Sequence, residues 1–272
     1  FPLHNFRRLA LLMHELRVVK TDLEIELLKE AVDITAKGFR RTLRFLKPGV
    51  TEYEVEAEWA REFIKRRGKF AYTPIVAAGK NNCVLHYLQN DQVCKKGQLL
   101  LLDVGSSYAN YNADMTRTIP VSGTYSPEQR AIYELVYRAQ EAGIRATRAG
   151  NPFFASNSEA SRVLAEGLAE LGLISSAADT GGLRRFFMHG TSHYLGLDVH
   201  DVGSYGPLRP GEVVTIEPGI YIPVAADIDP KWWNIGVRIE DDVLVTDGDP
   251  VILSGGAPRQ IDDVEALMRT IS

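Results

Sequence analysis

Two acidic residues near the middle of the chain are spaced to share one site. Asp103 closes a continuous apolar run, and Asp114 follows eleven residues later within the alternating segment Tyr111–Val121. Adjacent antiparallel strands joined by a turn at Ser106–Asn110 could direct both side chains to one place. Poorly solvated carboxylates repel each other unless a cation neutralises them, so the pair is a candidate metal site. A turn cap at one aspartate and an ion pair of the other with Arg117 is the alternative.

A second acidic pair follows in the C-terminal half. Glu217 ends the apolar segment Val213–Ile216, and we expect Glu240 to lie on a strand of the same hairpin. An ion pair with Arg238 is the ordinary explanation for either glutamate alone. Four carboxylates converging on one cleft, however, fit two hard divalent cations better than one.

The histidines are concentrated between these acidic pairs. His189, His193 and His200 lie within twelve residues, among glycines and apolar side chains. An imidazole added to carboxylates favours transition metals over magnesium or calcium. His4 and His14 stand alone, and we assign them no role.

The spacing of these residues indicates an internal duplication. His86 precedes Asp103 by seventeen residues, and His200 precedes Glu217 by seventeen; in both cases a glycine follows the histidine by eleven. We therefore expect two equivalent halves, at about 21–121 and 126–247, that bring their carboxylates and histidines to a shared central cleft.

The elements that must position these side chains follow from caps and periodicity. Thr21-x-x-Glu24 and Thr51-x-x-Glu54 are capping boxes, and Ser126 precedes a proline at a first helical position. The expected fold class is α+β with antiparallel strands. The predicted helices begin at residues 22, 52 and 127 and span 158–172 and 262–269, and the predicted strands are 99–104, 111–121, 213–216, 220–223, 236–239 and 243–246.

Composition narrows the function class. The 272 residues are 45% hydrophobic and 24% charged, with a net charge of −4, which disfavours nucleic-acid or anionic-membrane partners. No window reaches the roughly 18 apolar residues of a membrane span. Two cysteines, Cys83 and Cys94, do not form a disulfide framework, so we expect free thiols and a cytoplasmic location. We expect residues 1–20 to be a linker that follows a further N-terminal domain, and residues 21–272 to be a catalytic domain.

Several ordered segments resemble a known enzyme family. They are Asn82–Tyr87, Asp103-Val-Gly, Asp114–Thr118, His189–Gly196, Asp198–Asp201, Glu217–Tyr221 and Arg238–Glu240. The chain is similar to the "pita-bread" metallopeptidases, which include methionine aminopeptidase, aminopeptidase P and prolidase. The resemblance implies a pita-bread fold, in which two pseudo-symmetric halves with antiparallel sheet enclose a dinuclear metal site.

The resemblance also implies roles for individual residues. The metal ligands would be Asp103, Asp114, His193, Glu217 and Glu240, holding two divalent transition-metal ions, with Mn²⁺ favoured over Co²⁺ or Zn²⁺. The catalytic residues would be Glu217 as general base, with His200, His189 and His86 contacting substrate. Tyr221 and Arg238 would bind substrate or orient the bridging carboxylates.

Within the family, the segment from His189 to Gly203 is most similar to bacterial aminopeptidase P. That similarity implies release of the N-terminal residue from peptides with proline in second position, by attack of a hydroxide that bridges the two metals. Prolidase is the alternative, and methionine aminopeptidase or an inactive binding protein of the same fold fits less well. The family implies a homo-oligomer when full length. The stretch Ala225–Asn234, with Trp232 and Trp233, lengthens the hairpin and is expected to form one wall of the site; packing of the two tryptophans against a further domain or a partner is the alternative.

Overall fold

Capping boxes begin three of the long helices, as the sequence predicts. The computed structural model describes residues 2–269. In it, the hydroxyls of Thr21, Thr51 and Ser126 each accept a hydrogen bond from the backbone N–H three residues later, and the side chain of that later residue accepts one from the backbone N–H of the cap residue. These caps satisfy donors that a helix start leaves open. The helices are α2 (Asp22–Phe45), α3 (Glu52–Lys65) and α4 (Pro127–Ala146).

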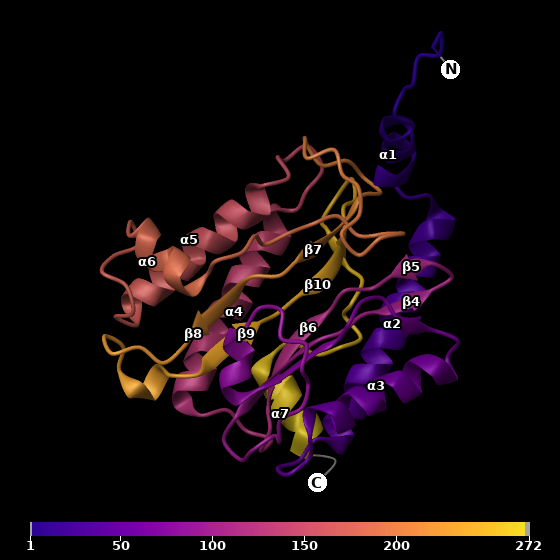
Figure 1. Ribbon diagram of the computed structural model, residues 1–272. Coiled ribbons are helices and arrows are strands. Elements are labelled where there is room, and N and C mark those ends of the chain that lie inside the picture. The colour runs from indigo at the N-terminus through magenta and orange to yellow at the C-terminus, as the bar shows by residue number, and fades with distance from the viewer. Residues whose placement is uncertain (1, 270–272) are drawn as a thin grey trace.

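The other helices complete the outer layer of the molecule. α4 packs along α5, and α2 packs along α3, so the strands lie between two helix pairs (Figure 1). α5 begins three residues earlier than predicted, and α1 and α6 were not predicted. Their bounds are α1 (Ala10–Val18), α5 (Ala155–Glu170), α6 (Thr180–Phe186) and α7 (Ile261–Arg269), with single turns η1 (Gly79–Cys83) and η2 (Pro230–Trp232). Residues 1 and 270–272, the latter within the predicted catalytic domain, lie outside the described part of the chain.

The first pair of long strands forms a ribbon that is interrupted in the middle. β3 (Leu99–Asp103) pairs with β6 (Thr116–Pro120), and β4 (Ser106–Tyr108) pairs with β5 (Tyr111–Asn112). The predicted turn at 106–110 was therefore too long. Only Ala109 and Asn110 turn the chain, with φ of 49° and 70°, and the residues before them are a strand. Asp103 and Asp114 both stand where the ribbon is interrupted.

The second ribbon follows the same plan. β7 (Val213–Ile216) pairs with β10 (Asp241–Leu244), and β8 (Gly219–Ile222) pairs with β9 (Ile235–Arg238). The last three predicted strands are displaced by one or two residues, because the residues around Glu217 and Glu240 leave the pairing. The shorter strands are β1 (Lys69–Phe70), β2 (Ile75–Ala78) and β11 (Val251–Ile252).

Side-chain and backbone bonds join the two ribbons edge to edge. Thr118 Oγ1 donates to the carbonyl of Arg238 at 3.0 Å, and the N–H of Glu240 donates to the carbonyl of Thr116 at 3.0 Å. The interruption of one ribbon therefore lies beside the interruption of the other. This is the arrangement that the duplicated spacing predicts.

Arg117 anchors this junction from inside the core. Its guanidinium is fully buried, donates to the carbonyl of Glu240 at 2.6 Å and pairs with Asp241 at 2.6 Å. The alternative in which Arg117 neutralises Asp114 is therefore wrong. Arg117 instead fixes the backbone that carries Glu240.

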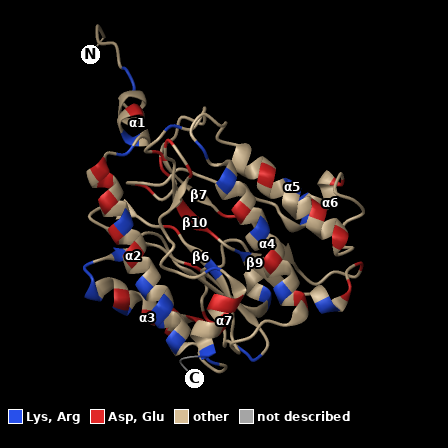
Figure 2. Ribbon diagram, turned by 180° about the vertical axis from the view of Figure 1, so that it is seen from behind, with Lys and Arg blue, Asp and Glu red and all other residues tan. Residues whose placement is uncertain are grey.

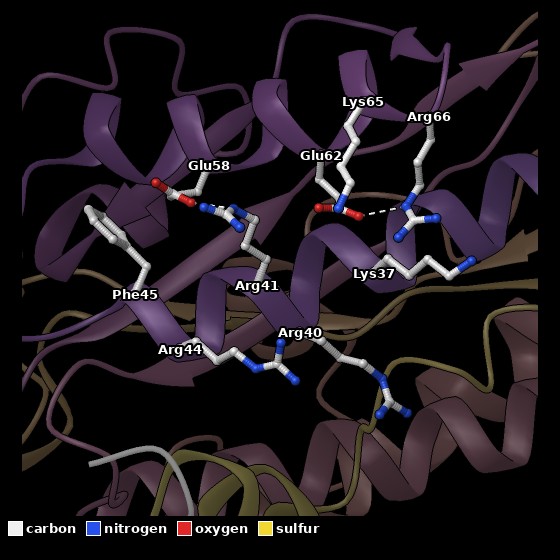
Figure 3. A pocket seen from close by; sticks show the side chains of 9 residues that line it. All are labelled: Lys37, Arg40, Arg41, Arg44, Phe45, Glu58, Glu62, Lys65 and Arg66. Atoms are coloured by element: carbon white, nitrogen blue, oxygen red, sulfur yellow. Dashed lines mark hydrogen bonds and ion pairs between the residues drawn. The ribbon is translucent and has the colours of Figure 1, made fainter.

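Charges are interspersed over the helices, with one basic concentration (Figure 2). A groove of about 480 Å³ between α2 and α3 is lined by six cations and two carboxylates. Three of the cations are paired: Arg41 with Glu58 and Arg66 with Glu62 (Figure 3), and Lys37 with Asp33. The basic residues of this groove are Lys37, Arg40, Arg41, Arg44, Lys65 and Arg66. Among residues 2–269, no helix combines the length and apolar character needed to span a membrane.

Candidate metal centre

A cavity of about 250 Å³ opens where the two ribbons are interrupted. Nine of the ten residues singled out from the sequence line it, and the tenth, Tyr221, is hydrogen-bonded to two of them. The side chains thus come together from both halves of the chain. The lining residues are Leu85, His86, Asp103, Asp114, His189, Gly190, Ser192, His193, His200, Glu217, Arg238 and Glu240.

His193 stands at the centre of the carboxylate group. Its Nε2 lies 3.4 Å from Asp114 Oδ2, 3.6 Å from Glu217 Oε1 and 3.9 Å from Glu240 Oε1. Its Nδ1 lies 3.0 Å from the carbonyl of Tyr194. Because Nδ1–H donates to a carbonyl, Nε2 is the nitrogen that faces the carboxylates and can bind a metal once it is deprotonated, as in most metal-binding histidines.

One atom each from Asp114, His193 and Glu240 lies within 4.8 Å of the others, which is close enough to hold one cation. Glu240 is oriented for this: Thr116 Oγ1 donates to its Oε2 at 2.7 Å and leaves Oε1 facing His193. The junction between β6 and β9 therefore positions both the candidate ligand Glu240 and the Thr116 hydroxyl that orients it.

Asp103 is held at the other side of the group by two donors. Arg238 Nη2 donates to its Oδ2 at 2.6 Å, and Tyr72 Oη lies 2.6 Å from its Oδ1. The same hydroxyl lies 2.6 Å from Asp114 Oδ1, so Tyr72 links the two aspartates. Arg238 thus neutralises Asp103, and the alternative in which it forms an ion pair with Glu217 or Glu240 is not seen.

Burial and like charges raise the proton affinity of this cluster. Burial, with the charge of Asp114 next, raises the pKa of Glu240 well above its usual range. Burial raises the pKa of Glu217 to about 7, although His193 and Arg238 oppose the shift. Burial disfavours a charged His193, but its bond to Asp114 and the nearby carboxylates outweigh this and raise its pKa to about 9. The protein alone therefore supplies too little positive charge for these carboxylates.

A further carboxylate increases that deficit. Asp242 is fully buried, and its Oδ2 accepts the backbone N–H of Asp114 at 3.1 Å. Within the described chain its Oδ1 has no hydrogen-bond partner. Carboxylate oxygens, one imidazole and this excess of buried negative charge fit divalent transition metals.

The histidines frame the cavity from two sides. His189 Nε2 lies 2.8 Å from the hydroxyl of Tyr221, which accepts from Arg238 Nη1 at 2.8 Å. Burial, with the charge of Arg238, lowers the pKa of His189 to about 4, so this ring is neutral near pH 7. Opposite, the ring of His200 lies 4.3 Å from that of His193, and burial followed by the charge of His193 lowers its pKa. His86 lines the same space.

Two features differ from the sequence analysis. Trp232 packs into the main core, and Trp233 Nε1 donates to the carbonyls of Ala225 and Ile228, so neither forms a wall of the cavity. Tyr72 was missed, because a single tyrosine between two very short strands carries no local signal of its position.

Comparison with known proteins connects this geometry to a family. The profile of metallopeptidase family M24 matches residues 26–247. A Xaa-Pro aminopeptidase of Haemophilus influenzae is 43% identical over 267 residues, covering 94% of this chain and 62% of that relative. One from Escherichia coli is 39% identical, covering 94% of this chain and 60% of that relative.

Solved structures agree with the sequence relatives. The aminopeptidase PepP of Pseudomonas aeruginosa superposes with a TM-score of 0.95 at 40% identity, covering 98% of this chain and 63% of that one. Proline aminopeptidase P II of Yersinia pestis gives 0.93 at 39% identity, covering 96% and 63%. The chain spans about three fifths of the length of these relatives. It has their α+β, pita-bread fold and belongs to metallopeptidase family M24.

Proposed function

We propose that this chain is the catalytic domain of a metal-dependent aminopeptidase that releases the N-terminal residue from peptides with proline in second position. The observation that carries this proposal is the convergence of four carboxylates and four histidines on one cavity. The names of the relatives, Xaa-Pro aminopeptidase and aminopeptidase P, supply the substrate class.

The proposed ligands of two divalent ions are Asp103, Asp114, His193, Glu217 and Glu240, with Mn²⁺ as the expected metal. When bound, such ions polarise a carbonyl and lower the pKa of a shared water toward neutrality. The buried carboxylates and the Nε2 of His193 supply the matching charge and donor types.

Glu217 is proposed as the general base. Its Oε1 lies 3.6 Å from His193 Nε2, among the other proposed ligands, where a carboxylate can take a proton from the attacking water and then release it. It would take a proton from the attacking water as oxygen bonds to the scissile carbon. As the C–N bond breaks, it would pass that proton to the departing proline nitrogen.

The histidines are proposed to hold the substrate. His200 would donate to the carbonyl oxygen as negative charge develops there. His189, whose Nδ1 donates to the carbonyl of Gly190 at 2.7 Å and whose Nε2 accepts from Tyr221, would lie against the substrate backbone with its neutral ring. His86 would contact the proline side. Tyr221 and Arg238 would keep His189 and Asp103 in place, as their bonds of 2.8 Å and 2.6 Å indicate.

Two wider properties are proposed with this function. The unpaired thiols of Cys83 and Cys94 support a reducing, cytoplasmic environment. The exposed Leu11, Leu12 and Leu16 of α1 support a homo-oligomer, because contiguous exposed apolar side chains are typical of contact surfaces. Light scattering of the purified protein measures the oligomer directly.

The test uses Ala-Pro-Ala, Ala-Ala-Ala and the dipeptide Ala-Pro, each with Mn²⁺, Co²⁺ or Zn²⁺. We expect alanine release from Ala-Pro-Ala and little from Ala-Ala-Ala; release from Ala-Pro alone would instead indicate a prolidase. Glu217→Ala should lower kcat by about 10²–10⁴-fold. Glu170→Ala, on the exposed end of α5, is the control and should match the parent. Turnover by Glu217→Ala close to that of the parent would remove the assigned base.

A further inference from the structure

The N-terminal segment grips the loop that carries His200. Arg17 Nη2 donates to Asp198 at 2.7 Å and also pairs with Asp201, so one cation joins the two acidic residues that flank His200. Asp198 is largely exposed, whereas the side chain of Asp201 is 1% exposed. The contact joins positions more than 180 residues apart in the chain.

A second cation of the N-terminal segment, Lys20, also pairs with Asp201. Lys20 Nζ lies 3.4 Å from Asp201 Oδ2, and both side chains are 1% exposed. The backbone N–H of Lys20 donates to the carbonyl of Gly211 at 2.8 Å, and this bond fixes the backbone from which the lysine side chain extends. A buried carboxylate with two cations is stable in its charged form, whereas removal of one cation leaves buried charge poorly compensated.

Asn112 holds the first part of the loop, with its N–H donating to the carbonyl of Gly196 at 3.0 Å and its Nδ2 to the carbonyl of Leu197 at 2.9 Å. Between Gly196 and Asp201 the loop has no helix or strand, and its internal backbone bonds are Gly196 N–H to Asp198 at 3.1 Å and Asp201 N–H to Tyr194 at 2.8 Å. A Cβ on Gly196 would lie 2.2 Å from Asp201 Oδ2 and 3.0 Å from Lys20 Cε, so the acid–lysine pair packs directly against the loop backbone.

We propose that Arg17 and Lys20 are positioning residues, whose ion pairs with Asp198 and Asp201 fix the loop that presents His200 to the cavity. This inference rests on the proposed function, in which His200 donates to the scissile carbonyl. A donor aids catalysis only while it is held at the position where charge develops, and a displacement of about 1 Å removes much of its effect. Residues 17–20 thus act on the reaction through Asp201, not through contact with the substrate.

The main variant is Arg17→Ala, and Arg17→Lys is its conservative partner. We expect Arg17→Ala to lower kcat for Ala-Pro-Ala by about tenfold or more, but by no more than the roughly 10²–10³-fold that complete loss of an oxyanion donor produces. KM and metal content should change little, and Arg17→Lys should recover most of the rate. Arg41→Ala is the matched control, because Arg41 also forms a half-buried ion pair, with Glu58, away from the cavity.

A double variant separates positioning from general destabilisation. In the His200→Ala background, Arg17→Ala should cost less than about twofold, because residues acting as one unit are not additive. An undiminished loss in that background would show that Arg17 acts elsewhere and would overturn the proposal.

Hydrogen exchange in metal-free protein tests, independently of activity, whether the ion pairs of Arg17 hold the loop that carries His200. Amides of residues 194–201 should exchange faster in Arg17→Ala than in the parent or in Arg41→Ala, with the rest of the chain unchanged. Unchanged exchange in this loop refutes the proposal, whatever the rates. A parent that exchanges as expected but cleaves no Xaa-Pro peptide would instead refute the proposed function.

Discussion

Removal of metal should make the stability of this protein fall as pH rises. Glu217 has an ordinary pKa of 4.5 and a folded-state pKa of about 7. Between these values the folded protein holds a proton that the unfolded chain has lost, so the free energy of unfolding decreases with increasing pH. At about 1.4 kcal/mol per unit, the interval corresponds to about 3 kcal/mol.

His193 extends the effect in the same direction. Its pKa rises from 6.5 to about 9 in the folded protein, so its stabilising proton is lost as pH rises through that range. Surface carboxylates such as Asp227, whose pKa is lowered to about 2 by its bond to Arg185, finish titrating below the window. Between pH 5 and 7 Glu217 alone changes the free energy of unfolding by about 2 kcal/mol, which corresponds to a fall in melting temperature of about 4–9 °C. His189, whose pKa is lowered to about 4, changes the stability in the opposite direction over this range.

Metal reverses this trend, because the ligands must be deprotonated to bind. At about a hundredfold excess over Kd, metal adds about 2.7 kcal/mol, and the difference between loaded and metal-free protein should widen with pH. Guanidinium unfolding at pH 5, 6, 7 and 8, in EDTA or in Mn²⁺, measures both curves. In the metal-free state Glu217→Gln should lose less stability than the parent between pH 5 and 7, by about 2 kcal/mol, whereas Glu170→Gln should follow the parent. Curves of the parent and Glu217→Gln that stay parallel from pH 5 to 7 would refute this account of the cluster.

Three further substitutions give distinct results. Asp114→Asn should lower the metal content below the two equivalents expected of the parent, by elemental analysis, without lowering the melting temperature of metal-free protein. Gly105→Ala would place a Cβ 1.8 Å from a backbone oxygen and should cost about 3 kcal/mol or more in urea unfolding, whereas Gly248→Ala, with its nearest atom at 3.9 Å, should be nearly neutral. Arg117→Met removes the nearer of the two cations that pair with the buried Asp241, leaving Arg259 at 3.5 Å, and should cost about 3–5 kcal/mol. A loss below about 1 kcal/mol would contradict the anchoring role of Arg117.

Local chemistry made parts of this fold predictable from the sequence. A capping box such as Thr51-x-x-Glu54 is complete within four residues, so no tertiary contact is needed to recognise it. Equal spacing of His86 to Asp103 and of His200 to Glu217 likewise constrains how two similar halves can meet. These short-range and repeated patterns gave the long helices, the paired ribbons and the residues that line the cavity.

Residues that depend on tertiary contacts were missed. Tyr72 bonds Asp103 and Asp114 across 31 and 42 positions, and Asp242 reaches Asp114 across 128. Nothing within a few residues of either marks these partners. The interrupted ribbon was also misjudged, because alternation predicts one continuous strand at 111–121, whereas Asp114 turns out of the pairing toward the cavity.

The groove between α2 and α3 is a local concentration of positive charge in a protein whose net charge is negative. Six cations and two carboxylates line it, in a chain with a net charge of −4 and a pI near 5.9. At pH 7 the rest of the protein is therefore more acidic than the total suggests, and the basic charge is locally concentrated at this groove. Its behaviour on an ion exchanger should depend on which face meets the matrix: a cation exchanger can retain this anionic protein by the groove and release it at moderate salt, where the Debye length is about 10 Å.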